Sequence, residues 1–217
     1  MKIDTILFDL DGTLVDSNEL ILETLRKTIL HYFPGAPLSR MALLEMMGPP
    51  LSETFGKLTD DPALVRRMIS SYRKTYTEME FEYISLYPSV CETLQDFREN
   101  GYKTALVTTK FRESALPAVT HFGLERFFDS LIALDDVKKP KPDAEPLLLA
   151  MEKLNSRHAV MVGDTPSDIL AGKNAGILTC GVGWSLKAGE IRALDPDFWI
   201  RDFSELFPMI EKRNEEE

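Results

Sequence analysis

Residues 7–15 read LFDLDGTLV, and this stretch decides how the amino-terminal part of the chain folds. The apolar run at residues 6–8 predicts a buried strand, and Asp9 and Asp11 follow where that strand ends. Side chains two residues apart on an extended backbone point to the same side, so the two carboxylates can share a hard cation. Gly12 then permits a sharp turn and a close approach to a ligand. The alternative is a strand that simply ends in an acidic turn.

The chain has 217 residues, 44% of them hydrophobic, and a formal net charge of −10. This length fits one large domain, or one core domain with a small insert. No cluster of Lys and Arg is broad enough to neutralise a nucleic-acid backbone, so we expect no nucleic-acid partner. No apolar stretch reaches the roughly 20 residues that span a bilayer, so we expect no membrane partner. Nothing in the sequence indicates an oligomeric state.

The cysteines and histidines show no metal-binding pattern. Cys91 and Cys180 are the two cysteines and lie far apart in the sequence, and we expect both to be small buried hydrophobic residues. His31, His121 and His158 are scattered, which argues against zinc. The amino terminus enters a strand directly, without signal-peptide organisation. We therefore expect a cytoplasmic protein in a reducing compartment.

Strand-like runs alternate with helical patterns over most of the chain. This alternation predicts βαβ units and an α/β fold with a parallel sheet covered on both faces. Strands are expected over residues 3–8, 104–109, 130–134, 159–162, 178–182 and 197–200. Helices are expected over residues 89–100, 113–122, 145–154, 166–175, 187–193 and 203–212.

One segment breaks the alternation. Residues 17–81 contain no strand-type run, only helical periodicity interrupted by Pro- and Gly-containing stretches. Its first helix carries an apolar stripe, made of Leu20, Ile21, Leu25 and Ile29. The sequence therefore predicts an all-helical insert between the first strand and the rest of the sheet.

Polar residues follow the later strands as well, where an open parallel sheet gathers its reactive groups. Thr108 ends an apolar run, and its hydroxyl and backbone N–H could hold a phosphoryl oxygen. One of the lysines at 138, 139 and 141 could place its ammonium beside the carboxylates at this edge. Lys141 is the favoured candidate because of its distance from the apolar run at 146–149, and Lys139 is the runner-up. Asp164 and Asp168 are one helical turn apart, so both carboxylates can face one pocket.

In this order the four motifs resemble the signatures of the haloacid dehalogenase (HAD) superfamily. They are D-x-D-G-T at residues 9–13, Thr108, Lys141 and G-D-x-x-x-D at residues 163–168. The resemblance runs essentially the whole length of the chain. It implies a Rossmann-like HAD core with a parallel sheet, and a small all-helical C1 cap inserted after the first strand. The core would comprise residues 1–15 and 83–217, and the cap residues 16–82.

The acidic side chains of these motifs predict a magnesium site. Several carboxylates cannot gather without a cation, and ligands that are all oxygen suit Mg²⁺. We expect the side chains of Asp9 and Asp164 and the carbonyl of Asp11 to hold Mg²⁺. Asp168 would order the water molecules on the metal.

The motifs also suggest a mechanism. Asp9 would attack phosphorus and form an aspartyl-phosphate. Asp11 would protonate the leaving oxygen and then take a proton from the attacking water. Lys141 and Thr108 would stabilise the charge on the transferred oxygens.

Asp11 distinguishes between the chemistries of the family. Family dehalogenases lack this second acid, so the resemblance implies transfer from a phosphoester or phosphoanhydride. A sugar-phosphate mutase would retain the same motifs, whereas a non-catalytic binding protein would have little need of them. Within the resemblance, several stretches, such as residues 107–110 and 134–138, look more like those of small bacterial pyrophosphatases than those of phosphoglycolate phosphatases. The expected substrate is a small anionic phosphate: pyrophosphate, or alternatively phosphoglycolate or another small phosphomonoester.

Pyrophosphate needs positive charge for its leaving half. Lys110 and Arg112 are the nearest candidates, with two of the three later lysines, residues 138 and 139, behind them. We also place Gly12 and Thr109 against the substrate. Gly48 lies in a Gly-Pro-Pro-Leu stretch that resembles the substrate-facing cap loop of the family, whose closure excludes water. The alternative for Gly48 is a simple helix–helix connection.

Overall fold

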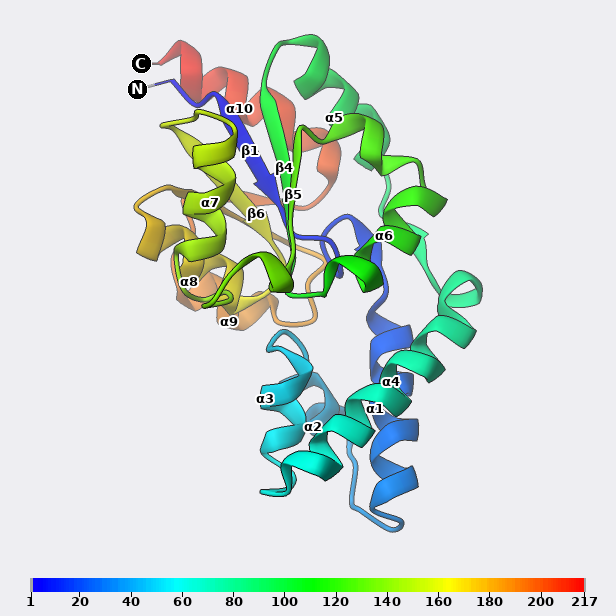
Figure 1. The fold of residues 1–217 in the computed structure, drawn as a ribbon. Helices are drawn as coiled ribbons and strands as arrows, with labels where there is room; N and C mark the ends of the chain where they lie inside the picture. The colour runs from blue at the N-terminus through cyan, green and yellow to red at the C-terminus, as the bar shows by residue number, and fades with distance from the viewer. Residues whose placement is uncertain (1, 217) are drawn as a thin grey trace. The chain divides into compact units, whose positions relative to one another are not determined.

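The computed structural model describes residues 2–216, and it divides into two compact units. The first, here called the α/β unit, runs up to Val15 and resumes at Leu86. The second, here called the helical unit, comprises Asp16–Ser85. Figure 1 shows the strands in the first unit and helices α1 to α4 in the second.

A six-stranded sheet forms the centre of the α/β unit, and its neighbouring strands pair in parallel. The predicted α/β fold with a parallel sheet is therefore confirmed. The short apolar runs become central strands because both faces of the sheet are covered. The strand order is β5 (Ser130–Ile132), β4 (Lys103–Val107), β1 (Thr5–Phe8), β6 (Ala159–Gly163), β7 (Leu178–Val182) and β8 (Phe198–Ile200).

Helices cover both faces of this sheet because successive strand residues point to opposite sides. Leu7 belongs to an apolar cluster that includes Leu147 of helix α7. Phe8 faces the other way and meets the rings of Phe97 and Phe203 at 6.3 Å each. The helices of this unit are α5 (Val90–Glu99), α6 (Arg112–His121), α7 (Glu145–Lys153), α8 (Pro166–Ala175), α9 (Ala188–Ala193) and α10 (Leu206–Glu215).

The expected elements differ from the observed ones mainly at their ends. The bounds of β7 and α8 are those predicted, whereas β4 ends two residues early, at Val107. The helix expected over residues 203–212 divides into a 3₁₀ turn, Phe203–Glu205, and α10, because Asp202 caps the turn at Ser204. Short 3₁₀ turns also cover Leu124–Phe127 and Leu134–Asp136.

The two cysteines behave differently. Cys180 is buried in β7, as expected. Cys91 is only half-buried, so the expectation of a buried side chain was wrong. On α5 the buried face consists of Val90, Thr93, Leu94 and Phe97, and Cys91 lies beside this face.

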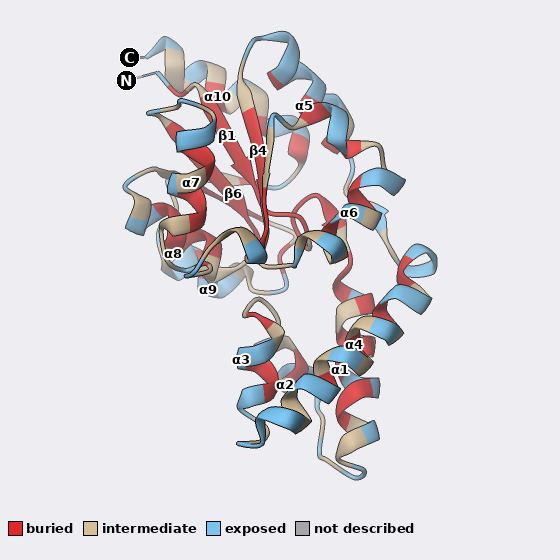
Figure 2. Ribbon diagram, viewed as in Figure 1, coloured by how far each residue is buried: buried red, intermediate tan, exposed pale blue. Residues whose placement is uncertain are grey.

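Helical periodicity in residues 17–81 is confirmed. The helices of this unit are α1 (Asn18–Tyr32), α2 (Arg40–Glu45), α3 (Leu51–Gly56) and α4 (Pro62–Tyr83). Of the apolar stripe on α1, Leu20, Leu25 and Ile29 are buried and Ile21 is half-buried. In the ribbon of Figure 2, buried and exposed segments alternate along α1 and α4, as expected of amphipathic helices.

Two very short strands were not predicted. The chain leaves the α/β unit through β2 (Val15–Asp16) and returns through β3 (Ser85–Leu86), and these strands form a second, two-stranded sheet. Among residues 2–216, no helix combines the length and the apolar character that a membrane crossing needs.

Candidate active site

The acidic motifs meet because their strands are neighbours. Asp9 follows β1 and Asp164 follows β6, and Phe8 lies opposite Val162 in the pairing of these strands. The backbone N–H of Asp9 donates to the carbonyl of Val162, at 3.0 Å. Gly12 has φ of +78°, and a β-carbon there would collide with the carboxylate of Asp164. Glycine is therefore required for the two turns to approach each other.

Lys141 joins the carboxylates. Its side chain is almost completely buried, and its Nζ lies 2.8 Å from Oδ1 of Asp9 and 2.6 Å from Oδ1 of Asp168. It also donates to the carbonyl of Val107, at 2.8 Å. Lys139, the runner-up, is exposed and lies 3.9 Å from Asp143. The structure therefore brings Lys141 to the acidic residues, and Lys139 forms an ion pair elsewhere.

Asp168 has two roles in the structure. One oxygen pairs with Lys141, and the other accepts from the backbone N–H and the hydroxyl of Thr165, at 3.0 and 2.6 Å. The second set of bonds closes the amino terminus of α8 as a capping box. Since both oxygens are engaged, Asp168 is a supporting residue beside Asp9 and Asp164.

Carboxylate oxygens of Asp9, Asp164 and Asp168 lie within 4.8 Å of one another and are all buried. Burial raises the pKa of Asp9 to about 7, even though the charge of Lys141 acts in the opposite direction. Burial, followed by the charge of Asp9, raises the pKa of Asp164 well above its ordinary value. Three carboxyl groups therefore share one ammonium, so the cluster has too little positive charge to balance them all in their ionised form.

The side chain of Lys141 stays protonated in these surroundings. Burial alone would lower the pKa of Lys141, but the carboxylates of Asp168 and Asp9 outweigh burial and raise it above its ordinary value. The ammonium is therefore present at neutral pH and can hold an anionic group beside Asp9.

Asp11 faces a different cation. Its carboxylate lies 3.0 Å from Nζ of Lys110, and both side chains are partly exposed. Asp11 thus stands outside the buried group formed by Asp9, Asp164 and Asp168. An ion pair at this accessible position can exchange partners when an anion arrives.

Thr108 and Thr109 follow β4 at the same edge of the sheet. The expectation that the backbone N–H of Thr108 binds a phosphoryl oxygen was wrong, because this N–H donates to the carbonyl of Ile132, at 2.9 Å. The hydroxyl oxygen of Thr108 accepts from the backbone N–H of Lys110, at 3.1 Å, and its proton remains a donor. Thr109 is half-buried beside it.

The structure shows bonds away from the acidic group for Arg112 and for the backbone of residues 138 and 139. The guanidinium of Arg112 donates to Asp136 and to the carbonyl of Leu131, and its contact with the substrate stays a prediction. The side chain of Glu145 accepts from the backbone N–H groups of residues 138 and 139, which fixes that loop. Lys110, Arg112 and the lysines at 138 and 139 are the candidates for binding the leaving group, and all lie in the described part of the chain. Among them, Lys110 alone forms an ion pair with a motif aspartate, Asp11.

Gly48 belongs to the helical unit, between α2 and α3, and has φ of +107°. This conformation favours glycine, because glycine has no β-carbon. Its contact with substrate stays a prediction.

The chain matches the model of the haloacid dehalogenase-like hydrolase family over residues 6–182. It belongs to this family. Pyrophosphatase PpaX of Halalkalibacterium halodurans is 42% identical over 213 residues, covering 97% of this chain and 98% of that protein. Pyrophosphatase PpaX of Bacillus velezensis is 42% identical over 208 residues, covering 94% and 95%. The predicted family is confirmed, and so is the prediction that the protein is a phosphohydrolase.

Two solved structures have the same fold. A haloacid dehalogenase-like hydrolase from Streptococcus pneumoniae superimposes with a TM-score of 0.81 at 24% identity, covering 95% of this chain and 98% of that chain. CbbY from Rhodobacter sphaeroides, solved in complex with phosphate, has a TM-score of 0.81 at 23% identity, covering 94% and 96%.

Three residues of this HAD hydrolase were missed by the sequence analysis. Thr13 donates to Oδ1 of Asp164, at 3.1 Å, and its position within the D-x-D-G-T motif could have suggested this. Trp184 and Ser185 follow β7 and also reach the acidic turns. The one sequence feature that could have identified Trp184 and Ser185 is their position after a strand, at the carboxyl edge of the sheet.

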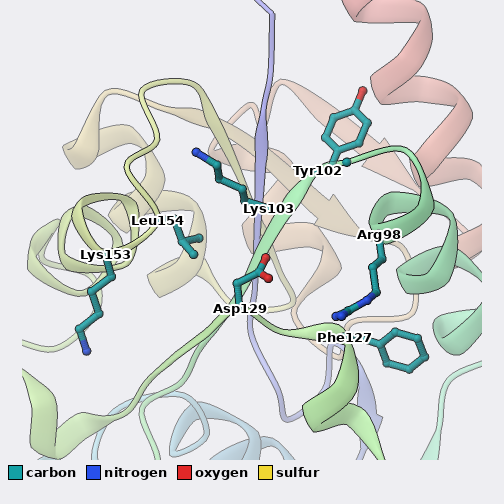
Figure 3. A pocket seen from close by; sticks show the side chains of 8 residues that line it. Arg98, Tyr102, Lys103, Phe127, Asp129, Lys153 and Leu154 are labelled. Atoms are coloured by element: carbon teal, nitrogen blue, oxygen red, sulfur yellow. The ribbon is translucent and has the colours of Figure 1, made fainter.

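A surface hollow of about 590 Å³ lies at the opposite edge of the HAD sheet, where β4 begins with Lys103 (Figure 3). Two of its cations donate to backbone carbonyls: Arg98 donates to Arg126, and Lys103 donates to Asn155 at 3.0 Å. The labelled side chains diverge in Figure 3 and do not surround a common point. This hollow is therefore separate from the acidic group.

Proposed function

We propose that this HAD hydrolase cleaves inorganic pyrophosphate, with Mg²⁺ bound, through an aspartyl-phosphate on Asp9. The observation that carries the proposal is the buried group of Asp9, Asp164 and Asp168 around Lys141, in a chain whose PpaX relatives match it over nearly their full length. This group supplies both a nucleophile and a place for a cation.

The donor set fits Mg²⁺. It consists of oxygen atoms alone, and the deficit of positive charge calls for a divalent cation. The side chains of Asp9 and Asp164 and the carbonyl of Asp11 would hold the ion, while Asp168 would order its water molecules. When bound, Mg²⁺ would neutralise charge on the phosphoryl oxygens.

Asp9 would be the nucleophile. The bond from Lys141 to Oδ1 of Asp9 fixes the orientation of this carboxylate and favours its ionised form. A new bond from Asp9 to phosphorus would form as the bond to the leaving phosphate breaks, and Asp11 would give a proton to the leaving oxygen. In the second step, Asp11 would accept a proton from a water molecule whose oxygen bonds to phosphorus as the bond from phosphorus to Asp9 breaks, which releases phosphate and restores Asp9.

Residues around the nucleophile would bind the substrate. The hydroxyl of Thr108 and the ammonium of Lys141 would hold oxygens of the transferred phosphoryl group. Lys110 would leave Asp11 and pair with the departing phosphate, which carries more negative charge than an alcohol. Gly12 and Thr109 would line the same space, since both lie in the turns that carry these groups.

The helical unit would act as the C1 cap. We propose boundaries at residues 16–82 for the cap, with residues 1–15 and 83–217 as the core, and we place Gly48 in the loop that faces the substrate. We also propose a cytoplasmic location, which free cysteines at 91 and 180 would suit.

A direct comparison of substrates tests the function. We expect kcat/KM for pyrophosphate to exceed that for phosphoglycolate in the presence of Mg²⁺, and EDTA to abolish both activities. A tenfold preference for phosphoglycolate, about 1.4 kcal/mol in transition-state binding, would replace pyrophosphate as the proposed substrate. Absence of phosphate release from either substrate would remove the proposal altogether.

A further inference from the structure

The loop that follows β7 reaches both acidic turns. The indole Nε1 of Trp184 donates to the carbonyl of Gly12, at 3.0 Å. The hydroxyl of the next residue, Ser185, donates to the carbonyl of Asp164, at 2.6 Å. One dipeptide therefore holds the backbone of the turn after β1 and that of the turn after β6.

These bonds restrict the peptide groups beside the proposed metal ligands. Gly12 is also held on its other side, because its N–H donates to the carbonyl of Val15, at 2.8 Å. Asp164 is held at its carbonyl by Ser185 and at Oδ1 by Thr13. A backbone carbonyl in a buried turn needs such a donor, and the donor then determines how the turn is oriented.

Packing fixes the indole itself. The ring of Trp184 packs against two rings, those of Tyr87, at 5.1 Å, and Phe203, at 5.2 Å, each tilted by 37°. Ser185 is buried, and its oxygen also accepts from the backbone N–H of Lys187, at 2.8 Å. Neither donor can move far without disturbing these contacts, so both present their protons at defined positions.

We propose that Trp184 and Ser185 are positioning residues for the cation site. The proposal rests on the proposed function, since it assumes that the carbonyl of Asp11 and the carboxylate of Asp164 bind one Mg²⁺. Ligands from two separate turns must be held within about 0.5 Å of their binding geometry. The two hydrogen bonds from one loop act together with the direct bond from Thr13 to Asp164 to hold those turns at a fixed distance.

The chain offers a matched pair of tryptophan variants, because Trp184 and Trp199 are its two tryptophans. Trp184→Phe keeps an aromatic ring and removes the N–H donor. Trp199→Phe makes the same chemical change on the edge strand β8, where the guanidinium of Arg192 lies 4.3 Å from the ring centre. Isothermal titration with Mg²⁺ alone gives the affinity of each folded variant.

We expect Trp184→Phe to bind Mg²⁺ about fivefold more weakly than Trp199→Phe, the effect of one lost hydrogen bond. In Trp199→Phe, where Trp184 is the remaining tryptophan, the emission of Trp184 should change on saturation with Mg²⁺. Equal affinities in the two variants would overturn the inference. A wild-type protein that binds no Mg²⁺ would instead contradict the proposed function.

Ser185 provides a second test that does not depend on the folding of Trp184→Phe. Ser185→Ala should weaken Mg²⁺ binding by a similar factor, and Ser185→Thr, which keeps the hydroxyl, should restore part of the affinity. Unchanged binding in Ser185→Ala would argue against its role. Thermal melting without metal shows whether each variant is folded before titration.

Discussion

At the scale of single residues, Asp9 has surroundings that match its proposed role as a nucleophile. Asp9→Asn keeps the size of the side chain but removes the anionic oxygen, so turnover should fall by at least about three orders of magnitude. Steady-state release of phosphate measures this loss. Asp96→Asn, on the exposed side of α5, is the matched control and should retain activity. A near-normal rate, with deamidation excluded by mass spectrometry, would contradict the assignment.

The raised pKa of Asp9 predicts how metal binding depends on pH. In the folded, metal-free protein this carboxyl keeps its proton up to about pH 7, whereas in the unfolded chain it loses the proton near 3.8. The folded state binds more protons between these values, so this group makes folding less favourable as pH rises through that window. Mg²⁺ requires the ionised form, so binding below pH 7 must release a proton.

We therefore expect the affinity for Mg²⁺ to fall as pH decreases below 7, by up to about tenfold per pH unit for each of the carboxyls of Asp9 and Asp164 that must lose a proton. Titration calorimetry in buffers of different ionisation enthalpy measures both the affinity and the protons released. An affinity that is constant between about pH 6 and about pH 8 would show that Asp9 is already ionised in the metal-free protein.

Residue types and their order in the chain were enough to select Asp9, Asp164 and Lys141, because parallel strands bring their carboxyl ends to one edge. Hydrogen-bond partners could not be inferred in this way. The N–H of Thr108 donates to the carbonyl of Ile132 because the pairing with β5 continues for one residue after β4 ends at Val107. The indole of Trp184 finds Gly12 across 172 residues, a contact that no local pattern encodes.

At the scale of elements, the packing of α8 onto β6 depends on Gly163. A β-carbon at this position would collide with the side chain of Asp168, which pairs with Lys141 and caps α8. Gly163→Ala should therefore push α8 from the strand and cost about 1–3 kcal/mol of stability. Chemical denaturation measures the change.

Gly189 is a suitable control for Gly163→Ala. It lies in helix α9, where an added β-carbon would meet nothing within 4 Å. Gly189→Ala should be neutral or slightly stabilising, because alanine favours a helix more than glycine does. Equal effects of the two substitutions would mean that the contact with Asp168 has no energetic weight.

Elements were predicted well where the hydrophobic period is sustained and poorly where it is not. The buried runs of β1, β6 and β7 and the apolar face of α1 extend over enough residues to show their period. The two-residue strands β2 and β3 are too short to show any alternation. Their pairing arises because the chain leaves and re-enters the α/β unit at neighbouring points.

At the scale of the whole molecule, each unit has its own hydrophobic core. In the helical unit Phe55 is completely buried, and its ring lies 6.1 Å from that of Tyr72. In the α/β unit Phe97 is completely buried and lies 6.3 Å from Phe8. Removing either ring should cost about 3–5 kcal/mol, because a large cavity would be left.

Separate cores predict that these losses stay local. Hydrogen exchange measured by mass spectrometry should show faster exchange in Phe55→Ala mainly within residues 16–85. The same measurement on Phe97→Ala should show faster exchange mainly in the strands of the sheet. Uniform acceleration over the whole chain in both variants would mean that the units unfold as one. Local acceleration would mean that the helical unit can loosen while the sheet that carries Asp9 and Asp164 stays folded.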